Sequence, residues 1–143
     1  MNEVSETEEE WAPWNIQLIQ NSDYYIESII DSYNGLEILF SDQLNNKKIK
    51  LKFGLLESYR FCDEHARIDV YKKLETNNLH GKYKCFEIKN SEYIKWLDQV
   101  SDTLTKIFDL IHYVILDDAG VLDIIAYCEP EVEIIKYSNK EKP

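Results

Sequence analysis

Hydrophobic residues dominate one stretch of the chain, residues 107–127 (IFDLIHYVILDDAGVLDIIAY), on both sides of a short polar break. β-branched and aromatic residues, which favour strands, occupy both alternating faces of residues 107–116. A strand that is apolar on both faces usually lies inside a sheet that is covered on each side. A helix over 108–116 would leave the polar break DDAG unexplained, whereas a turn explains it, with Gly120 supplying a positive φ angle. We therefore predict a two-stranded hairpin at the centre of the core.

Segments in which hydrophobic and polar residues alternate predict further antiparallel strands around this hairpin. Asn34-Gly35, the strongest short hairpin signal in the chain, separates two of these segments. In Lys48–Phe53 lysines alternate with apolar residues, which indicates a sheet face open to water at this strand. The lysine row also resembles the protection of an exposed sheet edge. The further predicted strands are 24–31, 36–41, 48–53, 55–62 and 83–88, with weaker patterns at 15–20 and 132–135.

One clear helix is predicted at about 91–104. Ser91 is a favourable N-cap, and Glu92 suits the positive end of a helix. Apolar residues follow with three-to-four spacing at positions 93, 94, 97, 100 and 104. Such a stripe is typical of a helix that covers one face of a sheet.

Residues 64–75 allow two interpretations. Val70 and Leu74 have helical spacing, whereas Ile68 and Val70 alternate as they would in a strand. We favour a short helix. Together with the strands, these two helices predict an α+β fold with a mainly antiparallel sheet of about seven to eight strands.

The length of 143 residues fits a single domain, and hydrophobic residues make up 44% of the chain, enough to bury a core. We expect a disordered acidic tail at 1–10, one domain at 11–137 and a polar tail at 138–143. Trp11 and Trp14 begin the domain, and we expect them to close an edge of the core. An anchor for a partner is the alternative interpretation of these two indoles.

The chain is strongly acidic, with a net charge of −11 from 27 acidic and 16 basic residues. This balance disfavours binding to nucleic acid or to an anionic membrane, and it favours a basic protein partner. No apolar run approaches the roughly 20 residues of a membrane span, and the N-terminus lacks the features of a secretory signal. The three cysteines lack the spacing of a disulfide framework. We therefore expect a cytoplasmic protein with reduced thiols.

No pattern in the chain specifies a catalytic or metal chemistry. Cys62 and His65 have the spacing of one metal-ligand pair, but His80 and Cys85 lack the spacing of a second. A thiol enzyme would need an oxyanion site and an orienting acid that the sequence does not show. His112 lies among apolar residues, where a structural histidine with satisfied hydrogen bonds is the favoured interpretation. We predict no cofactor, no metal and no catalytic residue; a small enzyme is the third hypothesis for function.

Four segments carry a family resemblance. They are a tyrosine–arginine strand, a helix entry of the form S-E-Y-hydrophobic-K-W, an H-Y strand and a Pro-bounded closing strand: LESYRFCDEHARI (56–68), FEIKNSEYIKWLDQVS (86–101), IHYVILDDAGVLDIIA (111–126) and CEPEVEII (128–135). Their arrangement, which spans about half of the chain, resembles small bacterial immunity proteins encoded next to polymorphic or contact-dependent toxins. The resemblance implies an α+β domain that binds and neutralises one cognate toxin, and it carries no catalytic residues to transfer.

Acidic groups at turns and strand ends are the predicted partner-binding residues, because an acidic inhibitor can enter the basic cleft of a nuclease toxin. Each of them has the alternative interpretation of a solvated loop charge. The second hypothesis for function is an acidic decoy, encoded by a phage or the host, that acts against a defence system. The predicted partner-binding residues are Asp63, Glu64, Asp117, Asp118, Glu129 and Glu131, with Trp96 as an aromatic anchor.

Overall fold

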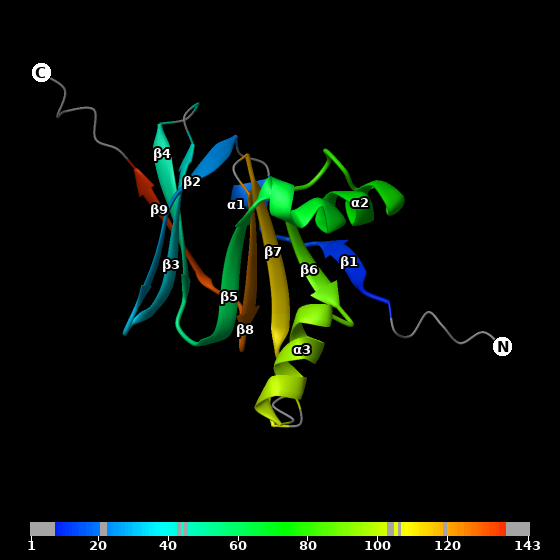
Figure 1. Cartoon of the computed structure of the whole chain (residues 1–143). Coiled ribbons are helices and arrows are strands. Elements are labelled where there is room, and N and C mark those ends of the chain that lie inside the picture. Colours follow the sequence, from blue (N-terminus) through cyan, green and yellow to red (C-terminus); the bar gives the residue numbers. More distant parts are fainter. Residues whose placement is uncertain are drawn as a thin grey trace, which may run out of the picture.

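The described part of the chain folds into two antiparallel sheets and three α-helices, as a computed structural model shows (Figure 1). The structure describes residues 8–20, 23–42, 44, 46–102, 105, 107–118 and 120–136. The fold class is α+β, as predicted, with nine strands in these described ranges. None of the helices in the same ranges reaches the length and apolarity that a membrane crossing requires.

The central sheet has the strand order β1-β6-β7-β8-β5, and the outer sheet has the order β2-β3-β4-β9. All neighbouring strands run antiparallel. The strands of the central sheet are β1 (Glu10–Pro13), β5 (Leu56–Asp63), β6 (Cys85–Lys89), β7 (Ile111–Asp117) and β8 (Gly120–Ala126). The strands of the outer sheet are β2 (Tyr24–Ser32), β3 (Gly35–Asp42), β4 (Lys47–Phe53) and β9 (Glu131–Lys136).

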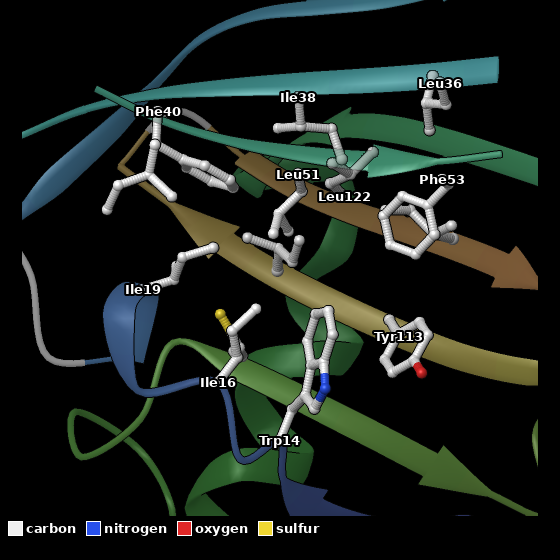
Figure 2. Close-up of a cluster of buried hydrophobic side chains, with 14 of the residues drawn as sticks. Trp14, Ile16, Ile19, Leu36, Ile38, Phe40, Leu51, Phe53, Tyr113 and Leu122 are labelled. Carbon is white, nitrogen blue, oxygen red and sulfur yellow. The ribbon is translucent and has the colours of Figure 1, made fainter. Parts of the chain in front are cut away.

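The main hydrophobic core lies between the two sheets (Figure 2). Alternate residues of β3 and β4, such as Ile38 and Leu51, point from the outer sheet toward Tyr113 and Leu122 of the central sheet. Trp14 stacks on Tyr113 with ring centroids 4.0 Å apart. Trp14 therefore closes one edge of this core, as predicted.

Two helices, α2 and α3, cover the other face of the central sheet. Val70 and Leu74 of α2 (Ile68–Thr76) pack against Val114 and Val121 of the central hairpin. α3 (Glu92–Ser101) packs Tyr93 and Leu97 against Ile125 of β8. The β7–β8 hairpin is therefore covered on both faces and lies inside the sheet, which confirms the central prediction from the sequence.

The helix boundaries follow local chemistry. Ser91 Oγ accepts a hydrogen bond of 3.0 Å from the Ile94 amide, and Asp102 in a left-handed conformation ends α3. The predicted extension of this helix to residue 104 falls outside the described residues. The ambiguous segment 64–75 is helical: a 3₁₀ turn at Glu64–Arg67 leads directly into α2.

The prediction of a strand at residues 15–20 is wrong. The segment contains the short helix α1 (Gln17–Gln20), and the first strand is β1. Ile16 accepts backbone hydrogen bonds from Ile19 and Gln20, and this turn brings both isoleucines into the core. The spacing of Ile16 and Ile19 is helical, whereas the same two residues would lie on opposite faces of a strand.

Two smaller predictions also need correction. Gly120 does not have a positive φ angle; a Cβ atom there would lie 2.2 Å from the Cys62 carbonyl oxygen, so the close approach of β5 excludes a side chain. The lysine row does not protect an edge, because β4 lies between β3 and β9. Two of its lysines are instead paired across strands: Lys48 lies 2.8 Å from Glu27, and Lys50 lies 3.5 Å from Glu133.

Part of the predicted acidic tail is built into the fold. Glu10 begins β1, and the Glu9 carboxylate accepts hydrogen bonds from the Glu92 amide (2.7 Å) and the Trp11 indole (3.2 Å). Glu9 also pairs with Lys73 of α2. Residues 1–7 and 137–143 lie outside the described residues.

Candidate functional site

Four of the seven predicted partner-binding residues meet at one end of the central sheet, which we call the acidic tip: Asp63, Glu64, Asp117 and Asp118. Asp63 ends β5 and lies opposite Gly120, the first residue of β8. Asp117 ends β7 and also lies opposite Gly120. The antiparallel register therefore places the ends of three strands together, although Asp63 and Asp117 are far apart in the sequence.

A cavity of about 530 Å³ opens beside the acidic tip. Its floor is apolar and is formed by Tyr24, Leu74 and Leu116. Carboxylates and aromatic or basic side chains share the remaining lining. These lining residues are Asp23, Glu64, Asp117 and Asp118, together with Tyr71, His80, Lys82, Tyr83 and Lys84; Gln20 and Gly81 complete the lining.

The polar groups around the cavity have an acidic excess, with four carboxylates and two lysine ammonium groups in the lining. Burial and the nearby charges of Glu64, Asp117 and Asp118 raise the pKa of Tyr71, so its hydroxyl stays protonated at neutral pH. The Lys84 ammonium lies over the Tyr24 ring, 4.7 Å from its centroid. A cation that enters from solvent would therefore meet carboxylates, a phenol and an apolar floor.

The four carboxylates of the tip differ in their hydrogen bonds to the backbone and in their exposure to solvent. Asp117 Oδ2 accepts a hydrogen bond of 2.7 Å from the Ile26 amide in β2, at the bulge between Ile26 and Ser28. This bond links the two sheets. Asp63 accepts the His65 amide at 2.8 Å, which lowers the pKa of its carboxyl. Asp118 is exposed and Glu64 half-buried, so these two are best placed for a partner.

The other three predicted residues do not join the acidic tip. Trp96 is 53% exposed on α3, beside Tyr93. Glu129 is exposed in the connection that follows β8, at the end of the sheet opposite to the tip. Glu131 begins β9 and lies opposite Lys52. Asp63, Glu64, Asp117 and Asp118 are therefore neighbours, whereas Trp96, Glu129 and Glu131 lie elsewhere. The role of all seven residues in partner binding stays a prediction.

A buried polar network crosses the helix-covered face of the central sheet, and the sequence analysis did not identify it. Asp123 of β8 is fully buried and accepts a hydrogen bond of 2.7 Å from His112 Nε2 of β7. Arg67 pairs with the same carboxylate, and Arg60 Nε lies 3.2 Å from it. His112 Nδ1 lies 2.7 Å from Ser91 Oγ.

The charge of Asp123 is fixed by these neighbours. Burial alone would raise its pKa, but the hydrogen bond from His112 and the charges of His112, Arg67 and Arg60 outweigh burial and lower the pKa to about 2. Asp123 is therefore ionised at neutral pH. No buried side-chain nitrogen or oxygen in the described part of the chain lacks a hydrogen-bond partner.

The order Ser91–His112–Asp123 has the composition of a hydrolase triad, but its geometry suits a structural role. Ser91 is 4% exposed and its Oγ caps α3, so the hydroxyl is engaged and shielded. The Asp123 carboxylate is shared with two guanidinium groups, which reduces its capacity to stabilise an imidazolium. Both ring nitrogens of His112 are hydrogen-bonded, as the sequence predicted for a satisfied structural histidine.

Cys85 and His65, two of the possible ligands or nucleophiles in the sequence, contact other groups. Burial raises the pKa of Cys85 to about 12, and its thiol lies 3.7 Å from the Tyr24 hydroxyl, so it is protonated at neutral pH. His65 contacts Asp63 rather than a thiol. All three cysteines are free, and the residues that the structure describes contain no group of three side chains arranged to hold a metal ion.

Comparisons of the chain with protein-family models, with curated proteins and with solved structures found no match. The case for a function therefore rests on the residues and their geometry.

Proposed function

We propose that the protein is a non-catalytic binding protein that recognises a basic protein partner through the acidic tip. The observation that carries this proposal is the meeting of Asp63, Glu64, Asp117 and Asp118 at one end of the central sheet, where the last three line a concave, partly aromatic surface. Basic side chains are attracted to such a surface. The tyrosine side chains in the lining add contact area and lose little conformational entropy on binding. The cytoplasm is the place of action that goes with this proposal and with the free thiols.

Within this class, the activity we propose is that of an immunity protein that blocks a cognate toxin. Two features support it. The net charge of −11 speeds the encounter with a basic toxin, and speed matters for an inhibitor that must act before the toxin does. The tip is also mounted on the buried β7–β8 hairpin and tied to β2 through Asp117, so its shape is set before the partner arrives.

Co-expression with the products of neighbouring genes tests this activity. The protein should restore growth in the presence of one of them and should co-purify with it as a stable complex. The partner whose toxicity is neutralised should carry an excess of basic residues on the surface that becomes buried in the complex. If no neighbouring product is neutralised, the immunity activity fails; if an acidic partner is bound, the role of the tip fails.

A further inference from the structure

The outer sheet extends past the central sheet at β9. Val132 and Ile134 lie opposite Leu51 and Ile49, which are fully buried, so all four side chains point toward the central sheet. Val132 and Ile134 are nevertheless each 41% exposed. The reason is the strand order: the central sheet ends at β5, and its edge residue Phe61 is itself 42% exposed. Val132 and Ile134 therefore form an apolar strip on β9 that the central sheet does not cover.

The outer edge of β9 has no paired strand in the described part of the chain. Such an edge presents unpaired backbone donors and acceptors to solvent, and proteins usually protect it. The opposite edge strand of the same sheet, β2, has that protection, because it carries a bulge and its Ile26 amide is bonded to Asp117. β9 has neither a bulge in its pairing with β4 nor a proline within its span.

The charges on β9 define what would pair with it. Glu131 and Glu133 lie opposite Lys52 and Lys50 on the solvent-facing side of the outer sheet. Glu133 is 3.5 Å from Lys50, and its side chain is still 63% exposed. One edge of β9 already pairs with β4. β4 has lysines on one face and Ile49, Leu51 and Phe53 on the other. The other edge of β9 is open to a further strand. A strand that pairs there would meet Glu131 and Glu133 on one face of the sheet and Val132 and Ile134 on the other.

We propose that the outer edge of β9 binds an extended segment of a protein partner, in which basic residues alternate with apolar residues. The basic residues would face Glu131 and Glu133, the apolar residues would cover Val132 and Ile134, and the backbone would continue the outer sheet. This surface shares no residue with the acidic tip, so the inference goes beyond the proposed function and does not depend on it.

A second copy of the chain fits this edge less well. Antiparallel self-pairing that places Val132 against Ile134 also places Glu133 opposite Glu133 of the other copy. Like charges directly opposite each other destabilise a sheet. The acidic strand therefore favours a basic strand over itself.

A peptide with the sequence of β4, KKIKLKF, is the probe that tests the edge. The full chain is titrated with this peptide and with the scrambled peptide KKKILFK, which has the same charge and composition without the alternation. We expect saturable binding of the first peptide and at least about tenfold weaker binding of the second. Amide exchange in the complex should slow along β9. Absence of saturable binding, or equal binding of the two peptides, would overturn the proposal.

Two matched variants locate the contact. Glu133→Lys changes the exposed edge, whereas Glu37→Lys changes the other carboxylate near Lys50, 3.9 Å away on the interior strand β3. We expect Glu133→Lys to weaken binding of KKIKLKF by about tenfold and Glu37→Lys to change it by less than about twofold. Circular dichroism checks that both variants are folded. An equal loss in both variants would contradict binding at the edge.

Two further outcomes would also overturn the proposal. Loss of KKIKLKF binding in Glu64→Lys/Asp118→Lys would place the peptide at the acidic tip instead. A concentration-dependent dimer with protected β9 amides in the absence of peptide would assign the edge to a second copy. Retention of peptide binding in the tip variant, together with a monomeric chain, is what we expect, and this result separates the two surfaces.

Discussion

At the scale of single residues, Asp123 has the greatest structural consequence. It lies in the apolar run VLDIIA, and its carboxylate joins β8 to His112 of β7, Arg60 of β5 and Arg67 before α2. A buried charge is tolerated only when partners replace the lost water. The same network reaches α3 through Ser91. One side chain thus connects the three strands whose ends form the acidic tip with the residues that precede α2 and α3.

Replacement of Asp123 by Asn should destabilise the fold by about 3–5 kcal/mol, because the charge of buried Arg67 would keep only one ionised partner, the exposed Asp69. Urea unfolding monitored by tryptophan fluorescence measures this change. Asp69→Asn is the matched control, since Asp69 lies 3.1 Å from the same guanidinium but is 59% exposed. Its effect should be below about 1 kcal/mol. Equal effects of the two substitutions would contradict the central place of Asp123.

The contribution of Asp123 should depend on pH in a defined direction. Its folded-state pKa is about 2, below the ordinary value of about 4 for an unfolded chain. The ionised carboxylate therefore stabilises the fold above about pH 4, and this contribution is lost as the pH falls toward 2. The difference in unfolding free energy between wild type and Asp123→Asn should shrink across that interval. A difference that stays constant from pH 7 to pH 2 would be the contrary result.

At the scale of elements, the β7–β8 hairpin depends on a glycine for space rather than for φ. Gly120→Ala should destabilise the fold by roughly 1–3 kcal/mol, because the added methyl group would meet the Cys62 carbonyl of β5 and the Phe61 ring. Thermal unfolding followed by circular dichroism measures the loss. Gly54→Ala is the control, since nothing lies within 4 Å of a Cβ atom at that position. A stable Gly120→Ala variant would show that β5 can move away from the hairpin.

The elements also show which parts of the fold were predictable. The central hairpin was predictable because apolar residues lie on both faces of β7, and α3 because Ser91 and its apolar stripe are local signals. α1 was missed because its four residues contain too little pattern, and its shape is set by the contacts of Ile16 and Ile19 with the core. The division into two sheets is set by pairing between distant strands, such as β4 with β9.

The candidate site was predictable in part for the same reason. Turn chemistry identified Asp117 and Asp118, and the end of a strand identified Asp63 and Glu64. The cavity beside these residues was not predictable, because Tyr71 and Tyr83 reach it only through the packing of α2 and the loop before β6. One signal for the buried network was present in the sequence: an aspartate within the apolar strand of residues 121–126 indicates a buried charge that needs a basic partner.

At the scale of the whole molecule, the net charge of −11 should affect how fast a basic partner binds. Long-range attraction accelerates association, and salt screens it beyond about 10 Å at 0.1 M ionic strength. We expect the association rate with the rescuing partner to fall at least about tenfold between 0.05 and 0.5 M salt, with a smaller change in the dissociation rate. Stopped-flow fluorescence measures both rates. An association rate independent of salt would contradict electrostatic steering.

The central claim is that the acidic tip forms the binding surface, and charge reversal tests it most directly. Asp117 is left unchanged because it holds β2, so the tip variant is Glu64→Lys/Asp118→Lys. The matched control is Asp109→Lys/Glu129→Lys, which makes the same charge change at exposed positions on the opposite end of the central sheet. The measurement is the affinity of each variant for the partner that co-purifies with and is neutralised by the wild-type chain. We predict a loss of at least about thirtyfold for the tip variant and less than about threefold for the control. Equal losses in the two variants, or an unchanged affinity in the tip variant, would contradict the claim.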